Sequence, residues 1–234
     1  MVRFGWETVK KRPWFFIGAI CLVGLLQLGL QAIAYIPLAG SIISTILGIY
    51  IGMGVIHFML RAHDATEQAS INDLWKPHPF WNYLGGAILK GLIASGPLLV
   101  SMLVWFITAL PRMKPGVEFQ LVPSDKIFLA LAVLAVLWAI YVSIRLAFVE
   151  YIVIDKGSGP IVAIKESLRI TRGKWVGLLV LGLALIGITI LGALALLLGL
   201  LVAIPLAMLA TVHAYRTLSA QARTAPAIPP APTV

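Results

Sequence analysis

Long apolar stretches alternate with short polar segments along this chain. No Asp, Glu, Lys or Arg lies between Arg12 and Arg61, and none lies between Lys174 and Arg216. A helix of about 20 residues crosses the roughly 30 Å hydrocarbon layer of a membrane, so each of these uncharged runs is long enough to cross it twice. The pattern therefore predicts an integral membrane protein with helical spans.

Two further apolar stretches lie between these runs and bring the predicted number of spans to six. Consecutive spans are expected to pair as three hairpins, which gives an all-α, polytopic transmembrane helix bundle. Gly96 and Pro97 fall inside the third span and predict a kink that neighbouring helices must accommodate. We expect one domain over residues 1–220 and a disordered Pro/Ala-rich tail over 221–234. The predicted spans lie at about 13–35, 41–60, 81–110, 125–149, 175–195 and 199–216.

Composition agrees with a membrane protein, because 60% of the residues are hydrophobic and only 12% are charged. The net charge of +9 would suggest nucleic acid binding in a soluble protein, but here it is explained by Lys and Arg retained on the cytoplasmic side, and we expect no nucleic acid partner. The basic amino end and first apolar stretch also resemble a cleavable signal peptide. However, the apolar stretch exceeds the usual 7–15 residues, and an uncharged partner helix follows it.

Lysine and arginine set the expected orientation. If the amino end is cytoplasmic, that side holds 13 Lys and Arg residues and the opposite side holds 3. The positive-inside rule then places both termini in the cytoplasm.

A short polar segment precedes each predicted hairpin. The first is residues 2–12, the second is a helix over 71–76 with a capping box formed by Ser70 and Asp73, and the third is a helix from Pro160 to about 172. We interpret all three as amphipathic helices on the cytoplasmic surface of the membrane, although Trp and basic residues gather at this boundary in many multi-pass proteins. Lys165, Arg169 and Arg172 would then contact anionic phospholipids.

Lys90 and Arg145 are the two cations inside predicted spans. One hypothesis is an anion site between the third and fourth spans, for example for a lipid phosphate. The other is that both long side chains extend to head groups or carbonyls at the membrane surface. Glu150 is the nearest acid in sequence.

No sequence motif indicates catalysis, a metal or a cofactor. The chain contains no nucleophile elbow, no phosphate-binding loop and no pair of acids inside the spans. His57 and His63 are six residues apart, which does not match the helical spacing of metal ligands. We therefore expect a non-enzymatic protein without a metal site or cofactor.

The segment from Arg145 to Trp175 carries a family resemblance. Its pattern is an Arg late in a span, an aromatic exit, a Gly-Pro turn, an Ala-x-x-x-Ser helix and a Thr-x-Gly-x-Trp start. In this pattern the chain resembles YciC-like proteins, an uncharacterised group of six-span bacterial membrane proteins, and the membrane domain of some glycerophosphoryl diester phosphodiesterases. The resemblance implies a multi-pass protein of the bacterial inner membrane and brings no catalytic residue.

The sequence thus favours an envelope protein that binds membrane lipids, above all anionic phospholipids, or a membrane protein partner. That partner is either another membrane protein or a second copy of this chain in a homo-oligomer. The alternative is a small transporter or channel for a solute or lipid, which predicts a polar cavity near the middle of the membrane beside Gly96 and Pro97.

Overall fold

The computed structural model describes residues 1–36, 39–76, 79–110, 122–195 and 198–224. Within these ranges the chain is helical and contains no strand. In chain order the helices are α1 (Val2–Lys11), α2 (Pro13–Ala34), α3 (Ala39–Asp64), the 3-10 helix η1 (Ile71–Trp75), α4 (Phe80–Ala109), α5 (Pro123–Arg145), α6 (Val149–Lys156), α7 (Pro160–Ile170), α8 (Trp175–Leu194) and α9 (Leu200–Thr224).

Six of the described segments are long and apolar enough to cross a membrane. They are α2, α3, α4, α8, α9 and the stretch Asp125–Lys156, which contains most of α5 and all of α6. The predicted fold class, an all-α multi-pass helix bundle, is confirmed.

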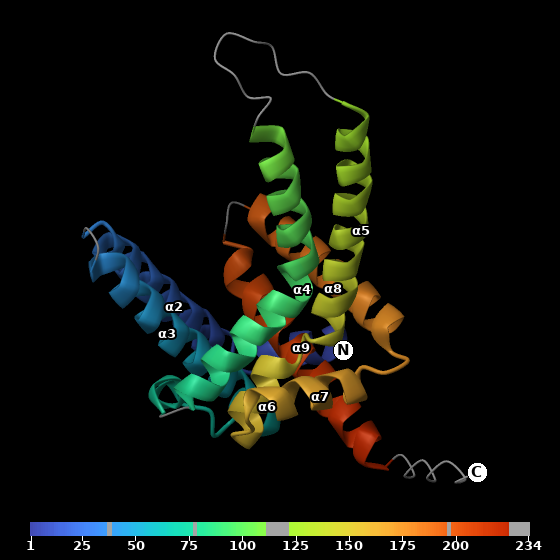
Figure 1. Ribbon diagram of the computed structural model, residues 1–234. Helices are drawn as coiled ribbons and strands as arrows, with labels where there is room; N and C mark the ends of the chain where they lie inside the picture. The colour runs from blue at the N-terminus through green and yellow to red at the C-terminus, as the bar shows by residue number, and fades with distance from the viewer. Residues whose placement is uncertain (37–38, 77–78, 111–121, 196–197, 225–234) are drawn as a thin grey trace.

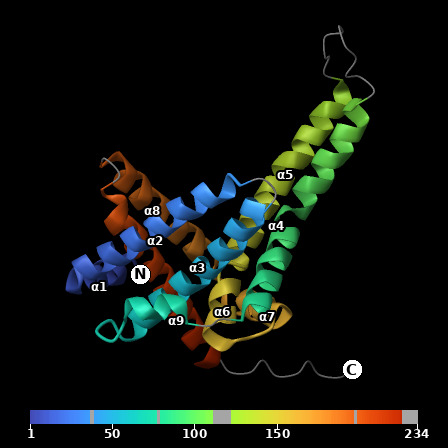
Figure 2. The same cartoon turned by 90° about the vertical axis from the view of Figure 1, so that its left-hand side faces the viewer.

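The long helices form three hairpins that rise from a common base (Figure 1). The hairpins are α2–α3, α4–α5 and α8–α9. The α2–α3 hairpin points away from α4–α5 in Figure 1, and the α8–α9 hairpin points away from it in Figure 2. The short helices α1, η1, α6 and α7 lie at the opposite end from the hairpin tips, where they pack against the ends of the long helices. We call this end the basal layer.

The packed core lies in the basal layer. Its fully buried side chains include Phe16 of α2, Met53 of α3, Val149 of α6 and Leu209 of α9. Toward the tips the helices expose large apolar side chains instead, which suits surfaces that face lipid tails rather than water. The bundle is therefore held together mainly at one end.

The fourth predicted span is divided into two helices. We expected one helix to residue 149, but α5 ends at Arg145 and α6 begins at Val149. The carbonyl of Arg145 would accept the Val149 N–H in a continuous helix. It accepts the hydroxyls of Ser167 and Thr171 at 2.9 and 3.1 Å instead, and the Val149 N–H donates to Leu146. Side chains from α7 thus replace one helical hydrogen bond, and the chain turns.

Helix α4 continues without interruption through Pro97. A proline has no N–H, so the carbonyl four residues earlier, that of Ile93, loses its helical partner. The indole N–H of Trp138 on α5 donates to this carbonyl at 3.1 Å. The neighbouring helix therefore satisfies the group that the proline leaves unpaired.

The last helix is longer than predicted. It extends to Thr224, past the expected end at residue 216 and into the segment expected to be disordered. Leu218 and Ser219 are buried, because this end of α9 belongs to the basal layer. Residues 225–234, the rest of the predicted tail, lie outside the described residues.

The second polar segment forms a 3-10 helix with the expected capping box. Ser70 Oγ accepts the N–H of Asn72 at 3.3 Å, and the Ser70 N–H donates to Asp73 at 3.0 Å. This segment lies against α3 at Gly54, where an added Cβ would be 2.1 Å from the Leu74 carbonyl oxygen. Glycine at this position permits η1 to pack onto the third helix.

Candidate functional site

Arg145 is the centre of a hydrogen-bonded cluster between the end of α5 and the end of α7. Its guanidinium donates to the carbonyls of Leu168 and Thr171 at 2.9 and 3.2 Å. Its own carbonyl accepts from Ser167 and Thr171. The arginine therefore caps the carboxyl end of α7, where a cation also interacts favourably with the helix dipole.

The positive charge of Arg145 lies close to carbonyl groups and to no acid of the described ranges. Among the residues that the structure describes, no carboxylate forms an ion pair with it, and its buried Nε has no hydrogen-bond partner. This guanidinium thus combines a structural role with a charge that no described carboxylate compensates.

Lys90 has a different environment. Its ammonium lies 3.1 Å from Glu150 Oε1 on α6, and the two side chains are 26% and 25% exposed. The pair links α4 to α6 and neutralises the charge of Lys90. The structure therefore separates the two cations of the predicted spans: Arg145 contacts α7, and Lys90 is paired with Glu150, the acid that lies nearest to Arg145 in sequence.

Lys165 and Arg169 of α7 are exposed, and so is Arg172, which lies two residues past the end of this helix. We call these three the basic residues of α7. Arg169 lies 3.4 Å from Glu166, while Lys165 and Arg172 form no ion pair with the described residues. The side of α7 that faces the bundle is made of small or buried side chains, Ala163, Ser167 and Ile170. The five predicted site residues thus form two groups: Lys90 with Glu150, and Arg145 with the basic residues of α7.

Sequence reasoning missed an ionic network that joins α3, α6 and α9. Arg216 of α9 contacts Asp155 of α6 at 2.7 Å and both carboxylate oxygens of Asp64 of α3, at 2.5 and 3.1 Å. Tyr215 donates its hydroxyl to Asp155 at 2.7 Å. The signal in the sequence was two acids and one arginine, each near the end of a different span that lies in the basal layer.

A histidine pair extends this network toward the amino terminus. His63 Nδ1 lies 3.0 Å from Asp64, and His63 Nε2 lies 3.1 Å from His213 Nδ1. The ring of Phe4 on α1 stacks on His213 with centroids 4.2 Å apart. Since α1 also approaches α9 closely at Gly5, these contacts hold the first helix against the last.

A polar cavity of about 430 Å³ lies beside this pair, between α1 and the segment after α3. Arg12 closes one side of this region by donating to the carbonyls of Thr66 and Glu67 at 3.1 and 3.2 Å. The cavity is lined by Phe4, Thr8, Lys11, His63, Asp64, Ala65, Thr66, Glu67 and Gln68.

Within the described ranges, no three His, Cys, Asp or Glu side chains are arranged to hold a metal ion. His78, which belonged to the polar cluster considered in the sequence, lies outside these ranges.

Comparison with protein families gives one result. The family described as "Protein of unknown function (DUF975)" matches residues 7–222, which is most of the 234-residue chain. The chain therefore belongs to this family. No match was found among curated proteins or among solved structures.

Proposed function

We propose that this DUF975 protein is a non-enzymatic protein of the bacterial inner membrane whose basal layer binds anionic phospholipids. In this proposal both termini are cytoplasmic, so the basal layer lies at the cytoplasmic leaflet. The proposal includes a second non-enzymatic binding function, in which the protein binds a membrane protein partner. The observation that carries the proposal is the exposed surface of α7.

That surface combines apolar and cationic side chains. Ile161 and Val162 are 61% and 57% exposed, and Lys165, Arg169 and Arg172 are exposed beside them. A helix at the end of membrane spans that exposes both kinds of side chain matches the boundary between acyl chains and head groups. Since only Arg169 is paired with an acid in the described part of the chain, the surface keeps a net positive charge.

Arg145 supports the same proposal. It lies at the carboxyl end of α7, it contacts only carbonyl groups, and its charge adds to that of the exposed arginines and lysine. Each Lys or Arg near an anionic membrane surface contributes about 1 kcal/mol to binding. Three exposed cations on α7 are therefore worth about 3 kcal/mol, or roughly a hundredfold in affinity.

The test is the triple variant Lys165→Gln, Arg169→Gln and Arg172→Gln. Purified, delipidated protein is titrated with phosphatidylglycerol and, separately, with phosphatidylcholine, and bound lipids are counted by native mass spectrometry. We expect up to a hundredfold weaker binding of phosphatidylglycerol and little change for phosphatidylcholine.

A charge-retaining variant serves as the matched control: Lys165→Arg, Arg169→Lys and Arg172→Lys. It should bind phosphatidylglycerol as the wild type does. Equal binding by the glutamine variant and this control would contradict the proposal. Solute flux through proteoliposomes that depends on Lys90 or Arg145 would favour the transporter alternative, but α4 is continuous at Pro97, so the broken helix that motivated that alternative is absent there.

We also propose that the chain is related to YciC-like proteins and to the membrane domain of glycerophosphoryl diester phosphodiesterases. Three of the positions that carry the resemblance, Arg145, Ser167 and Thr171, share one hydrogen-bonded cluster. If the related proteins also cap the end of α7 with this arginine, the same contacts would explain why Arg, Ser and Thr occur in them at this spacing.

A further inference from the structure

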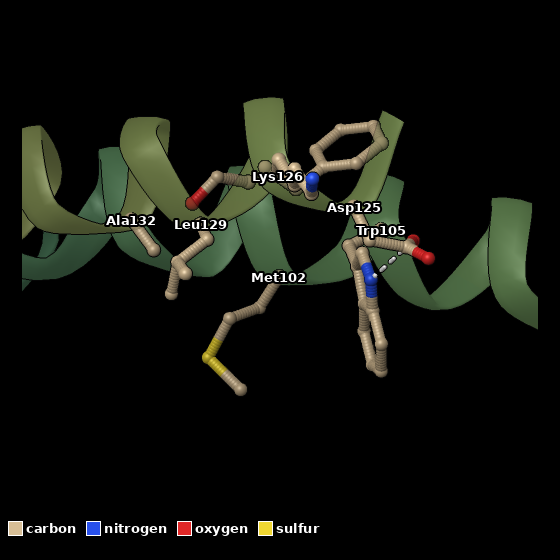
Figure 3. A pocket seen from close by; sticks show the side chains of 8 residues that line it. Met102, Trp105, Asp125, Lys126, Leu129 and Ala132 are labelled. Carbon is tan, nitrogen blue, oxygen red and sulfur yellow. Dashed lines mark hydrogen bonds between the residues drawn. The ribbon is translucent and has the colours of Figure 1, made fainter. Parts of the chain in front are cut away.

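A cavity of about 320 Å³ lies between α4 and α5, at the end of this hairpin far from the basal layer. Figure 3 shows Met102, Leu129 and Ala132 alongside Trp105 in its wall. Ser101 also lines it, but its hydroxyl donates to the Leu98 carbonyl at 2.9 Å, so it satisfies its hydrogen-bonding group within its own helix. The wall is therefore almost entirely apolar.

One side of the cavity is fixed by a buried hydrogen bond. Trp105 Nε1 donates to Asp125 Oδ1 at 3.0 Å, and Asp125 is only 6% exposed. The other carboxylate oxygen of Asp125 accepts the Val122 N–H at 2.8 Å. These bonds hold the indole in place, so the wall is formed before any ligand arrives and less ordering is required on binding.

Polar and apolar groups lie at different depths along the cavity. Lys126 follows Asp125 directly, is exposed, and forms no hydrogen bond or ion pair with the described residues. Leu129 and Ala132 lie three and six residues further along α5, which is about 4.5 and 9 Å deeper at 1.5 Å per residue. The mouth of the cavity thus carries the exposed Lys126 ammonium beside the buried Asp125 carboxylate, and its interior is apolar over about 9 Å of depth.

We propose that this cavity binds one acyl chain of an anionic phospholipid from the leaflet opposite the basal layer, with the phosphate next to the Lys126 ammonium. At this depth in a membrane the apolar wall faces acyl chains, and the exposed ammonium complements a phosphate. The volume is at the small end of the range for ligand sites, about 300–1,000 Å³, which suits part of one chain rather than a whole lipid. This site is separate from the basic surface of α7.

The experiment compares Ala132→Trp, which fills the cavity, with Ala130→Trp. Ala130 is exposed on the same helix and does not line the cavity, so the two variants add the same side chain nearby. Both variants and the reference protein also carry Lys165→Gln, Arg169→Gln and Arg172→Gln, so that lipid binding at the basic surface of α7 does not contribute. The delipidated proteins are titrated with dioleoyl phosphatidylglycerol, and the tightest-bound lipid is followed by native mass spectrometry. We expect at least tenfold weaker binding of that lipid in Ala132→Trp and unchanged binding in Ala130→Trp.

Lys126→Gln is a second variant that leaves the cavity open. It should weaken the binding of phosphatidylglycerol several-fold and leave that of phosphatidylcholine unchanged. If Ala132→Trp does not give a monodisperse protein, Ser101→Leu fills the same space from α4 and should have the same effect. Equal retention of lipid by the filled, control and wild-type proteins would overturn the proposal, and it would do so whatever the variants of α7 show.

Discussion

Loss of Arg216 should destabilise the protein more than loss of any other single charge that the structure describes. Arg216 is bonded to Asp155 and to both oxygens of Asp64, and these acids belong to two other helices. The side chain of Asp155 is 17% exposed, so in Arg216→Gln its charge would be buried without a cation. Removal of one partner of a buried pair costs about 3–5 kcal/mol.

The expected magnitude is smaller than that upper range. The Asp64 side chain is 46% exposed, and pairs in contact with solvent contribute only about 0–1 kcal/mol. Tyr215 also continues to donate to Asp155. We therefore expect a loss of about 2–4 kcal/mol, which for a chain of this size lowers the melting temperature by roughly 5–15 °C.

The assay is thermal unfolding in detergent, followed by tryptophan fluorescence and by size-exclusion chromatography. Arg223→Gln is the matched control, because Arg223 is exposed on the same helix and forms no ion pair with the described residues. A double-mutant cycle with Asp155→Asn should give a coupling of at least about 1 kcal/mol. A melting temperature for Arg216→Gln within about 2 °C of that of the control would refute the reasoning.

Three further predictions concern local contacts. Gly54→Ala should lower stability by about 1–3 kcal/mol, measured by thermal unfolding, because its Cβ would meet the Leu74 carbonyl oxygen at 2.1 Å. Trp138→Phe should cost about 1 kcal/mol in the same assay and much less in a Pro97→Ala background, where the restored N–H can pair with the freed carbonyl. Burial raises the pKa of Asp73, but hydrogen bonds from a lysine and a backbone N–H outweigh burial and hold this pKa below its usual value. The stabilisation of the fold by the Asp73 carboxylate is therefore present above about pH 4 and is lost as the pH falls further. Asp73→Asn should reduce the slope of the unfolding free energy against pH between about 5 and 3.

Each of these predictions has its own control or opposing result. Gly52→Ala adds the same methyl group two residues away, where the nearest atom is the Tyr83 hydroxyl at 3.9 Å, and should leave stability unchanged. An equal cost of Trp138→Phe with and without Pro97 would show that the indole N–H does not serve the freed carbonyl. If Asp73→Asn has the same acid profile as the wild type, the Asp73 carboxylate contributes no pH-dependent stability.

The sequence by itself determined the number and order of the long apolar spans, while the ends of α5 and α9 differ from the predicted ones. Uncharged runs such as the one between Arg12 and Arg61 admit no other structure in a membrane, because every backbone group must be paired within its own helix. Local signals were equally informative, since the capping box of Ser70 and Asp73 depends on residues three apart. Lys90 and Arg145 were found as candidates because a charge inside an apolar run is costly.

Only the tertiary structure decided what these residues contact. The hydroxyls of Ser167 and Thr171 donate to the Arg145 carbonyl, which would otherwise accept the next helical N–H, so α5 ends at Arg145. No local sequence pattern predicts that distant side chains bond to this carbonyl. The network of Arg216 joins residues more than 60 positions apart, and hydrophobic periodicity carries no information on such pairs. Helix formation depends on neighbours within one turn, whereas ion pairs and cavities depend on how hairpins pack, which is why the spans were predictable and the candidate sites were not.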